Sequence, residues 1–549
     1  MSRPTARAFL LTLSLATLAR LSAQERAAAP EPVAPPMPTQ DAAAPATSAA
    51  PVPAPAPAPA QPLTAEPAPN PGIEPVPVQS APVLTLEQAI TRVLEKNFNL
   101  RAQGFNAANA KENLVIAKAG FDPTFTALAS RSKNQGVTID NRTAGNIIVS
   151  NYRQDQTDVR VGVVQNLVTG AAVNASASVL RSSNNLAVNS FNPAYNSDLS
   201  VALTQPLLKG FGPKVNRAII EQSKIGITIA NLNYKGSVLQ AVRDTEAAYY
   251  TLAFARGQLA VKQRSLELAQ KLFDENKVRK NTGVATDLDV LTAQVGVATA
   301  QNGVVLAQQQ VRNSEDNLLG LTGQFEFTTP PGSVSFTPYS DPAPSVADSF
   351  RLARDLQPTY VAALETRKQL EIAATVANNG KLPTLNFDGA VGFNGVNNTT
   401  HTSIDDLRGG ENYNWQADLS LSVPWGLKSD RAKARIALNN LNQQQANIQQ
   451  IEQNLLLQVR AAVLAVSTNI ESVQISAQAS QLAERQYELQ KAKFDAGLST
   501  SRDVLQSQTD LETVRVNDLQ ARVNLRIAVA NLHQLDGTSL DRFHIALAD

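Results

Sequence analysis

A long stretch without proline constrains the fold of this 549-residue chain more than any other feature. From Asn216 to about Lys280 the pattern is helical throughout, and Leu252, Leu259 and Leu266 recur every seven residues. A sustained seven-residue repeat of apolar side chains indicates coiled-coil packing. A helix of this length spans about 100 Å at 1.5 Å per residue, which is more than a small globular domain can enclose. The chain is therefore expected to form long paired helices.

A glycine-centred turn interrupts these helical patterns twice. The segment "NTGVATDLDVLTAQ", from Asn281, aligns without a gap with "DAGLSTSRDVLQSQ", from Asp495, at an offset of 214 residues. Gly283 and Gly497 are predicted to end the first helix of each pair as left-handed caps. Acidic residues follow in the first turn of the returning helix, where the helix dipole favours them. They are Asp287, Asp289 and Asp503.

The N-terminal part of the chain predicts export from the cytoplasm. Arg3 and Arg7 precede a short apolar run and a small-residue cleavage site, so residues 1–23 are predicted to be a secretory signal peptide. A membrane anchor is the alternative, but the run falls short of the ~20 residues that span a bilayer. Residues 24–82 are rich in proline and alanine, which predicts a disordered, extended linker.

The rest of the chain is predicted to be two repeats with the same order of parts. The first covers residues 83–327 and the second residues 345–540, with a proline-rich connection near 328–344. Each repeat opens with a pair of helices, continues with alternating strands and ends with a long helical hairpin. The opening helices are expected at 85–97, 99–119, 345–356 and 358–378.

Alternation of apolar and polar side chains predicts two strands in each repeat. They lie at 121–130, 197–204, 385–393 and 413–423. About ten residues with one apolar face are typical of an outer-membrane strand, although a half-buried strand of a soluble sandwich looks similar. No segment after the signal peptide is expected to be long and apolar enough for a transmembrane helix. Four strands cannot close a barrel, so several chains are expected to share one.

Two proline residues stand where strand and helix are expected to meet. Pro206 and Pro424 end the segments "ALTQP" and "SLSVP". Proline removes a donor from the strand ladder and suits the first turn of a helix. The strands are therefore expected to run straight into the coiled coils.

Bulk composition excludes several function classes. A net charge of +1 lacks the basic excess of a nucleic-acid-binding protein. The absence of cysteine rules out disulfides and thiolate metal sites. The three histidines, His401, His533 and His544, are scattered, and no nucleotide-binding loop or nucleophile motif appears, so no enzyme, cofactor or metal site is predicted. A structural coiled-coil protein without transport activity is the remaining alternative, which the strands at Leu385 and Tyr413 argue against.

Together the two turns, the two strand–proline junctions, "FDPTF" at Phe121 and the repeat resemble the TolC family of outer-membrane efflux channels. The resemblance extends from Leu84 to about Leu540. It implies a mainly α fold with β structure, in which a homotrimer shares one twelve-stranded transmembrane barrel continuous with a long α-helical tube in the periplasm. It also implies a passive exit duct that works with a periplasmic adaptor and an inner-membrane transporter. The cargo, whether drug, metal or a protein of type I secretion, stays open.

The resemblance also implies roles for the two turns at the periplasmic tip. The candidate adaptor contacts are Gly283, Val284, Gly497 and Leu498. Asp503 falls on an aspartate of the family's constriction, and Asp289 on one that links neighbouring hairpins. Three further gate positions depart from the family's pattern, since Phe494 replaces a tyrosine, Ser499 an arginine and Gln506 a second aspartate. The hypothesis is that Asp503 from each copy forms a cation-favouring ring; a plain helix-dipole role is the alternative.

One region leaves the strand count open. Between Arg131 and Asn196 lie two further alternating stretches, Val159–Val164 and Ala171–Leu180, with Thr169-Gly170 as a tight turn between them. They are either an extra hairpin of the barrel or an ornament outside it. The family's four strands per chain are the expectation.

Overall fold

The computed structural model describes residues 83–143, 146–185, 191–324, 331–336, 339 and 342–546. Contacts divide the chain into two units, Met1–Val76 and Pro77–Asp549, and every described residue lies in the second. The predicted signal peptide and nearly all of the predicted linker, residues 1–82, lie outside the described residues.

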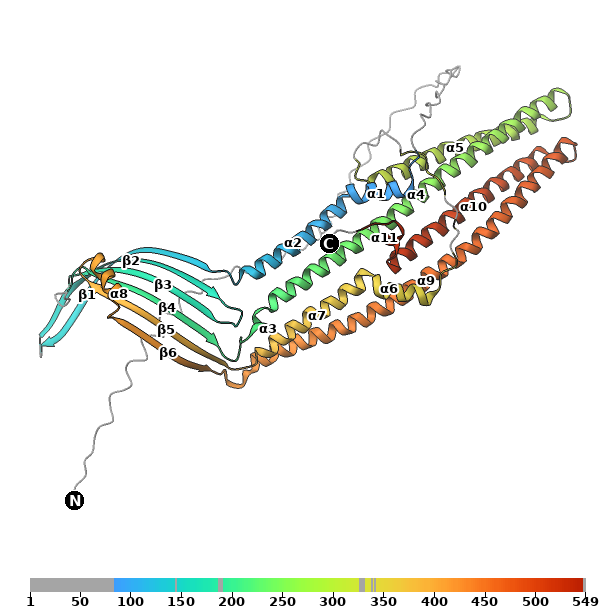
Figure 1. Cartoon of the computed structure of the whole chain (residues 1–549). Helices are drawn as coiled ribbons and strands as arrows, with labels where there is room; N and C mark the ends of the chain where they lie inside the picture. The colour runs from blue at the N-terminus through green and yellow to red at the C-terminus, as the bar shows by residue number, and fades with distance from the viewer. Residues whose placement is uncertain are drawn as a thin grey trace, which may run out of the picture. The chain divides into compact units, whose positions relative to one another are not determined.

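Six strands form one antiparallel sheet in which each strand pairs with its neighbours in sequence order (Figure 1). The strands are β1 (Thr124–Thr143), β2 (Asn146–Asn166), β3 (Ala172–Asn184), β4 (Ala194–Pro206), β5 (Thr384–Asn397) and β6 (Tyr413–Ser422). The four strands predicted from sequence overlap β1, β4, β5 and β6, although β1 begins only at Thr124 and β6 ends at Ser422.

The expectation of four strands per chain is wrong. The stretch Val159–Val164 lies in β2 and most of Ala171–Leu180 lies in β3, and both belong to the same sheet. The predicted turn between them is confirmed, with Gly170 at φ +94°. The outer part of β1 and β2 escaped prediction because polar residues such as Lys133 and Gln154 occupy both faces there, so the alternation fades.

The helices that open each predicted repeat are confirmed to within a residue or two. They are α1 (Leu86–Lys96), α2 (Phe98–Ala119), α6 (Val346–Leu356) and α7 (Pro358–Asn379). The long helices are α4 (Ala218–Asn281), α5 (Asp287–Leu321), α9 (Lys428–Asp495) and α10 (Ser501–Asp536). Short helices complete the described chain: α3 (Pro213–Asn216), α8 (Thr400–Gly409), η1 (Trp425–Leu427) and α11 (Ser539–Arg542).

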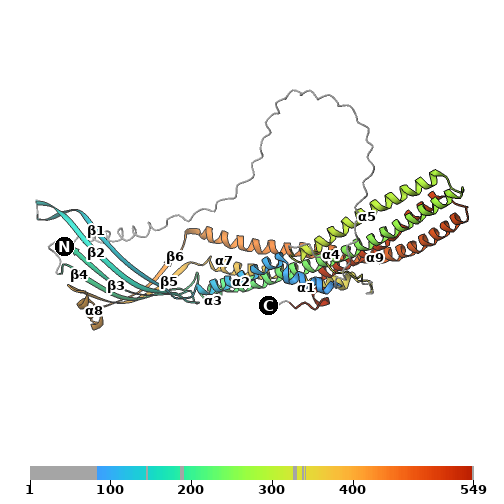
Figure 2. The ribbon, with the colours of Figure 1, turned by 90° about the horizontal axis from the view of Figure 1, so that it is seen from above.

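Two sets of four helices lie side by side along this unit. Beside the sheet the order is α2, α4, α7, α9, and toward the hairpin turns it is α5, α4, α10, α9 (Figures 1 and 2). The helix seams are apolar, as the heptad pattern predicts. Leu252 on α4 packs with Leu318 on α5 and Val523 on α10, while Val459 and Val466 on α9 pack against Leu525 on α10.

The strand–helix junctions are more elaborate than expected. Pro206 does end β4, but the helical backbone resumes only at Pro213, the first residue of α3. At the second junction, Pro424 precedes the turn η1 and α9 begins at Lys428. The two junctions are tied together, because Lys209 and Asp430 form an ion pair at 3.2 Å.

One further expectation is corrected by α5. This helix is long and apolar enough to cross a membrane by length and composition. Only 22% of its most apolar 18-residue stretch is buried within one chain. α5 begins at the hairpin turn and packs along α4, as the second helix of a hairpin does.

Candidate functional site

The two hairpin turns have the same backbone geometry. Gly283 and Gly497 adopt φ values of +80° and +77°, in the left-handed region that favours glycine. Val284 N–H donates to Arg279 O at 2.9 Å, and Leu498 N–H donates to Lys493 O at 2.8 Å. These bonds satisfy carbonyls that the end of a helix would otherwise leave open. The predicted left-handed caps are confirmed.

Each returning helix begins with a capping box, a reciprocal pair of hydrogen bonds between the N-cap and the third helical residue. Thr286 caps α5 with Asp289, and Thr500 caps α10 with Asp503. The carboxylate of Asp289 accepts from Thr286 N–H at 2.9 Å and Oγ1 at 2.7 Å. That of Asp503 accepts from Thr500 N–H at 3.1 Å and Oγ1 at 2.7 Å.

These hydrogen bonds set the charge of both carboxylates. Bonds from the side chain and backbone of Thr286 lower the pKa of Asp289, and those of Thr500 lower the pKa of Asp503. Ser499 Oγ donates a further bond to Asp503 at 3.2 Å. Both aspartates are therefore ionised at neutral pH, and each bonds within its own turn.

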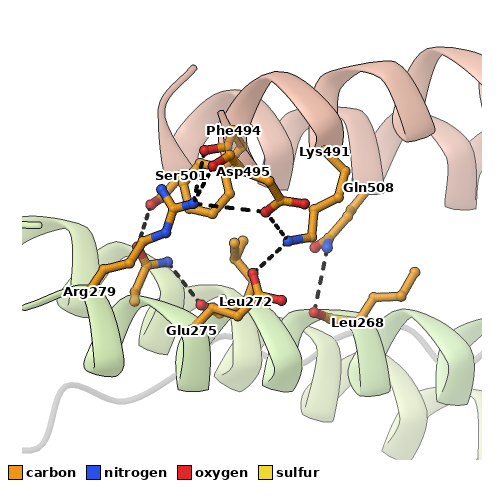
Figure 3. A network of polar contacts seen from close by, with 10 residues as sticks. Leu268, Leu272, Glu275, Arg279, Lys491, Phe494, Asp495, Ser501 and Gln508 are labelled. Carbon is orange, nitrogen blue, oxygen red and sulfur yellow. Dashed lines mark hydrogen bonds and ion pairs between the residues drawn. The ribbon is translucent and has the colours of Figure 1, made fainter. Parts of the chain in front are cut away.

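The ends of α4 and α9 are joined by an arginine stacked on an aromatic ring (Figure 3). The Arg279 guanidinium lies 4.0 Å from the centroid of the Phe494 ring and donates to Phe494 O at 2.9 Å. Phe494 is buried and packs with Leu272, Ala293 and Val504. A tyrosine hydroxyl is not needed for this link, since the ring face and the backbone oxygen of Phe494 supply it.

A lysine makes the second link between these helices. Lys491 Nζ on α9 lies 2.6 Å from Glu275 Oε2 on α4 and 2.7 Å from Asp495 Oδ1 (Figure 3). Burial alone would lower the pKa of Lys491, but its hydrogen bonds with Asp495 and Glu275 together raise it. The lysine therefore stays charged and holds the two carboxylates beside it.

A buried polar contact joins α4 to α10 just inside the turn. Ser501 Oγ donates to Asn276 Oδ1 at 2.7 Å, and Asn276 Nδ2 donates to Leu272 O at 2.9 Å. Asn276 is 1% exposed, so these bonds are made away from water. The sequence reasoning missed Asn276, although an asparagine on the buried side of a coiled coil often fixes the register.

Some of the predicted tip residues have exposed side chains, whereas others are held by hydrogen bonds. Val284 and Leu498 are 74% and 80% exposed, and no neighbour would meet a side chain at either turn glycine. Ser499 accepts from Gln490 Nε2 at 2.6 Å as well as donating to Asp503. Gln506 donates to Asp510 on its own helix at 2.9 Å, a bond that stays within α10.

The amino-acid sequence is similar to those of known outer membrane proteins. The model of the outer membrane efflux protein family matches residues 171–324 and 351–538. Outer membrane protein TolC of Escherichia coli (strain K12) is 23% identical over 361 residues, which are 63% of this chain and 71% of that protein. TolC of Vibrio cholerae is 26% identical over 309 residues, or 55% of this chain and 67% of that protein.

Solved outer-membrane proteins share the fold. The Campylobacter jejuni CmeC channel aligns with a TM-score of 0.60 and 17% identity, covering 82% of this chain and 85% of CmeC. VceC of Vibrio cholerae aligns with a TM-score of 0.61 and 14% identity, covering 82% and 96%. Because the family model matches more than half of the sequence, the chain belongs to the outer membrane efflux protein family, a family of channel proteins, and is an outer membrane protein.

Proposed function

We propose that three copies of this chain form a passive duct from the periplasm to the outside, the exit channel of a tripartite efflux or type I secretion system. A periplasmic adaptor and an inner-membrane transporter would deliver the cargo and the energy. The observation that carries the proposal is a sheet with one apolar face that continues, through the two junctions, into a row of long helices.

The apolar face suits contact with lipid. Phe125, Leu199, Trp415 and Leu419 lie on it and are 76%, 45%, 72% and 67% exposed. The opposite face carries polar groups, including Asp388, whose carboxylate accepts from Thr204 Oγ1 at 2.7 Å. In hydrocarbon a sheet must also close so that no edge remains unpaired. In a structural coiled-coil protein surrounded by water, this apolar face would be exposed to solvent, which is unfavourable.

The outer helices of the row support an assembly of several copies. On α9 the exposed Ile475, Leu482 and Leu489 recur every seven residues, and on α5 the exposed Leu288, Leu291 and Val295 follow helical spacing. These two helices stand at opposite edges of the row, so the stripe of one copy would pack on the other stripe of the next copy. Repeating this contact around an axis would give a hollow tube.

The turns would then form the periplasmic end of the tube. We assign Gly283, Val284, Gly497 and Leu498 to the adaptor contact, supported by the exposure of both apolar side chains. We assign the links of Arg279 and Lys491 to the closed state of the gate. Asp289 would support its turn through the capping box, whereas Asp503 would in addition face the axis as a ring of charge.

The gate proposal predicts that a double variant, Arg279→Ala with Lys491→Ala, conducts more than the unmodified protein. Each charge-assisted hydrogen bond contributes about 1.5–3 kcal/mol, so losing both should shift the balance toward the open state by at least about tenfold. The measurement is ion current through purified full-length protein in planar lipid bilayers without nucleotide. Lys271→Ala, which removes an ion pair within α4 alone, is the control and should leave the current unchanged.

Two results would contradict the proposal. Assembled, inserted protein that passes no current in either form would count against the duct itself. Current that is present but equal in the double variant and in Lys271→Ala would leave the duct standing and remove the gate role from Arg279 and Lys491.

The charge ring predicts a loss of cation preference in Asp503→Asn. Asparagine keeps an acceptor for the Thr500 N–H, so the cap is largely retained while the charge is removed. Reversal potentials under a KCl gradient should move toward zero in this variant and stay in place in Asp289→Asn. If Asp503→Asn and the unmodified protein give the same reversal potential, Asp503 is a helix cap and nothing more.

A further inference from the structure

The sheet holds two more strands than the resemblance implies, and their outward residues are apolar like those of the other four. One row of paired residues crosses every strand from β1 to β6. It consists of Phe125, Val163, Ala175, Val201, Val391 and Trp415. The neighbouring row is equally apolar. It consists of Ala127, Val161, Ala177, Leu199, Phe393 and Tyr413.

The alternating rows on the other face are polar or small. One consists of Thr126, Gly162, Ser176, Ser200, Gly392 and Asn414. Ser176 and Ser200 are hydrogen bonded across β3 and β4 at 3.0 Å. The hairpin of β2 and β3 therefore has the same lipid-suited and water-suited faces as the rest of the sheet, which an ornament outside a barrel would not need.

Strand pairing identifies the edges at which copies can meet. β3 is paired on both sides, with β2 from Gln154↔Asn184 to Asn166↔Ala172 and with β4 from Ala172↔Thr204 to Ser182↔Ala194. Among the described strands, only β1 and β6 have an unpaired side. Because an antiparallel sheet with an even number of strands has edge strands of opposite direction, β1 of one copy can extend the pattern beside β6 of another.

We propose that all six strands form the barrel wall and that β1 of each copy pairs with β6 of the next, so that three copies close a barrel of eighteen strands. The inference rests on the proposed function, since it assumes a shared barrel. Barrel diameter grows roughly linearly with strand number, and 16–18 strands leave a water-filled channel. The outer opening is then about half as wide again as that of a twelve-stranded barrel, and suits bulky solutes.

The chain has no cysteine, so pairs of introduced cysteines can test which strands meet. The first panel combines one cysteine on β6, at Trp415, Ala417 or Leu419, with one on β1. The matched panel combines the same β6 positions with one on β3, the strand that would lie at the subunit edge if β1 and β2 stood outside a twelve-stranded wall. The outward-facing positions are Phe125, Ala127 and Ala129 on β1, and Ala175, Ala177 and Val179 on β3.

Each panel samples several pairing registers. Barrel closure staggers neighbouring strands, and the stagger between β1 of one copy and β6 of the next is not defined by a single chain. Oxidation of the full-length protein in outer membranes should give covalent dimers and trimers with β1–β6 pairs and none with β3–β6 pairs. Crosslinking through β3, or no β1–β6 crosslink in protein that conducts ions, would overturn the six-strand wall. Unmodified protein that neither assembles nor conducts would instead overturn the proposed function, so the two failures are distinguishable.

Discussion

Replacing Glu246 with glutamine is expected to stabilise the fold above pH 7 by up to about 3 kcal/mol, from the shift of its pKa from 4.5 to about 7. Glu246 lies on α4 and is 7% exposed. Burial raises its pKa, and attraction to Arg542 and Arg526 offsets only part of that effect. Glutamine has a similar shape and no charge to desolvate.

The sign of the pH dependence follows from the same shift. Below pH 4.5 the carboxyl is protonated in both folded and unfolded chains and contributes nothing. Between 4.5 and about 7 the unfolded chain loses the proton first, so the free energy of unfolding falls as the pH rises. Thermal unfolding of Glu246→Gln should lack this decline, whereas Glu112→Gln, at an exposed position on α2, should keep it. Equal declines in both variants would show that Glu246 is not the buried acid responsible.

Gly170→Ala is expected to destabilise the junction between sheet and helices by about 2–5 kcal/mol, from backbone strain and overpacking together. Gly170 has φ +94°, and a Cβ there would overlap the carbonyl oxygen of Gly210 and lie 2.8 Å from Asn216 Nδ2. Asn216 holds Gly210 O and Gly212 O through its side-chain amide, so the turn has little room to move.

Alanine variants at two other glycines distinguish backbone strain from steric overlap as the cause of the expected destabilisation. Gly212 has φ +95° with open space around it, and Gly136 has open space and no positive φ. The temperature at which the assembled protein dissociates should fall most for Gly170→Ala, less for Gly212→Ala and least for Gly136→Ala. A fall for Gly212→Ala as large as that for Gly170→Ala would assign the effect to strain alone.

The helical part of the fold could be predicted because its signals are local. Heptad spacing predicted the long helices, and the two glycines with the aspartates that follow them predicted the turns. Gly283 and Gly497 have the predicted left-handed backbone. The apolar composition of α5 was not foreseen, and its apolar stripe is exposed within one chain.

The sheet was predicted only where one face is apolar. Where Arg131–Gln135 on β1 pairs with Arg153–Thr157 on β2, polar residues lie on both faces, so the pairing is decided by the partner strand rather than by either strand's own pattern. The α8 helix was missed because its Thr- and Asp-rich sequence, with His401 beside Asp405, resembles a loop. Its position follows from contacts with β4 and β5, including the buried Ser197–Ser403 hydrogen bond at 2.7 Å.

The candidate site was predicted in position but not in detail. Asp289 and Asp503 were expected at the turn, and the structure adds the threonines that bond them. The link from Arg279 to Phe494 depends on two residues 215 positions apart, and no local pattern reveals such a pair. Phenylalanine in place of tyrosine at position 494 suggested that a hydroxyl-mediated link at the tip is lost. In the structure the Arg279 guanidinium instead stacks on the Phe494 ring.

Electron cryomicroscopy of the full-length protein, extracted from outer membranes in mild detergent, tests directly whether several copies share one barrel and one helical tube. The expected result is a threefold particle in which a detergent-covered barrel continues into a hollow helical cylinder about 100 Å long, as the 68 residues of α9 require. Monomers, or slender rods without a detergent belt, would contradict a shared barrel and leave the chain as a structural coiled-coil protein.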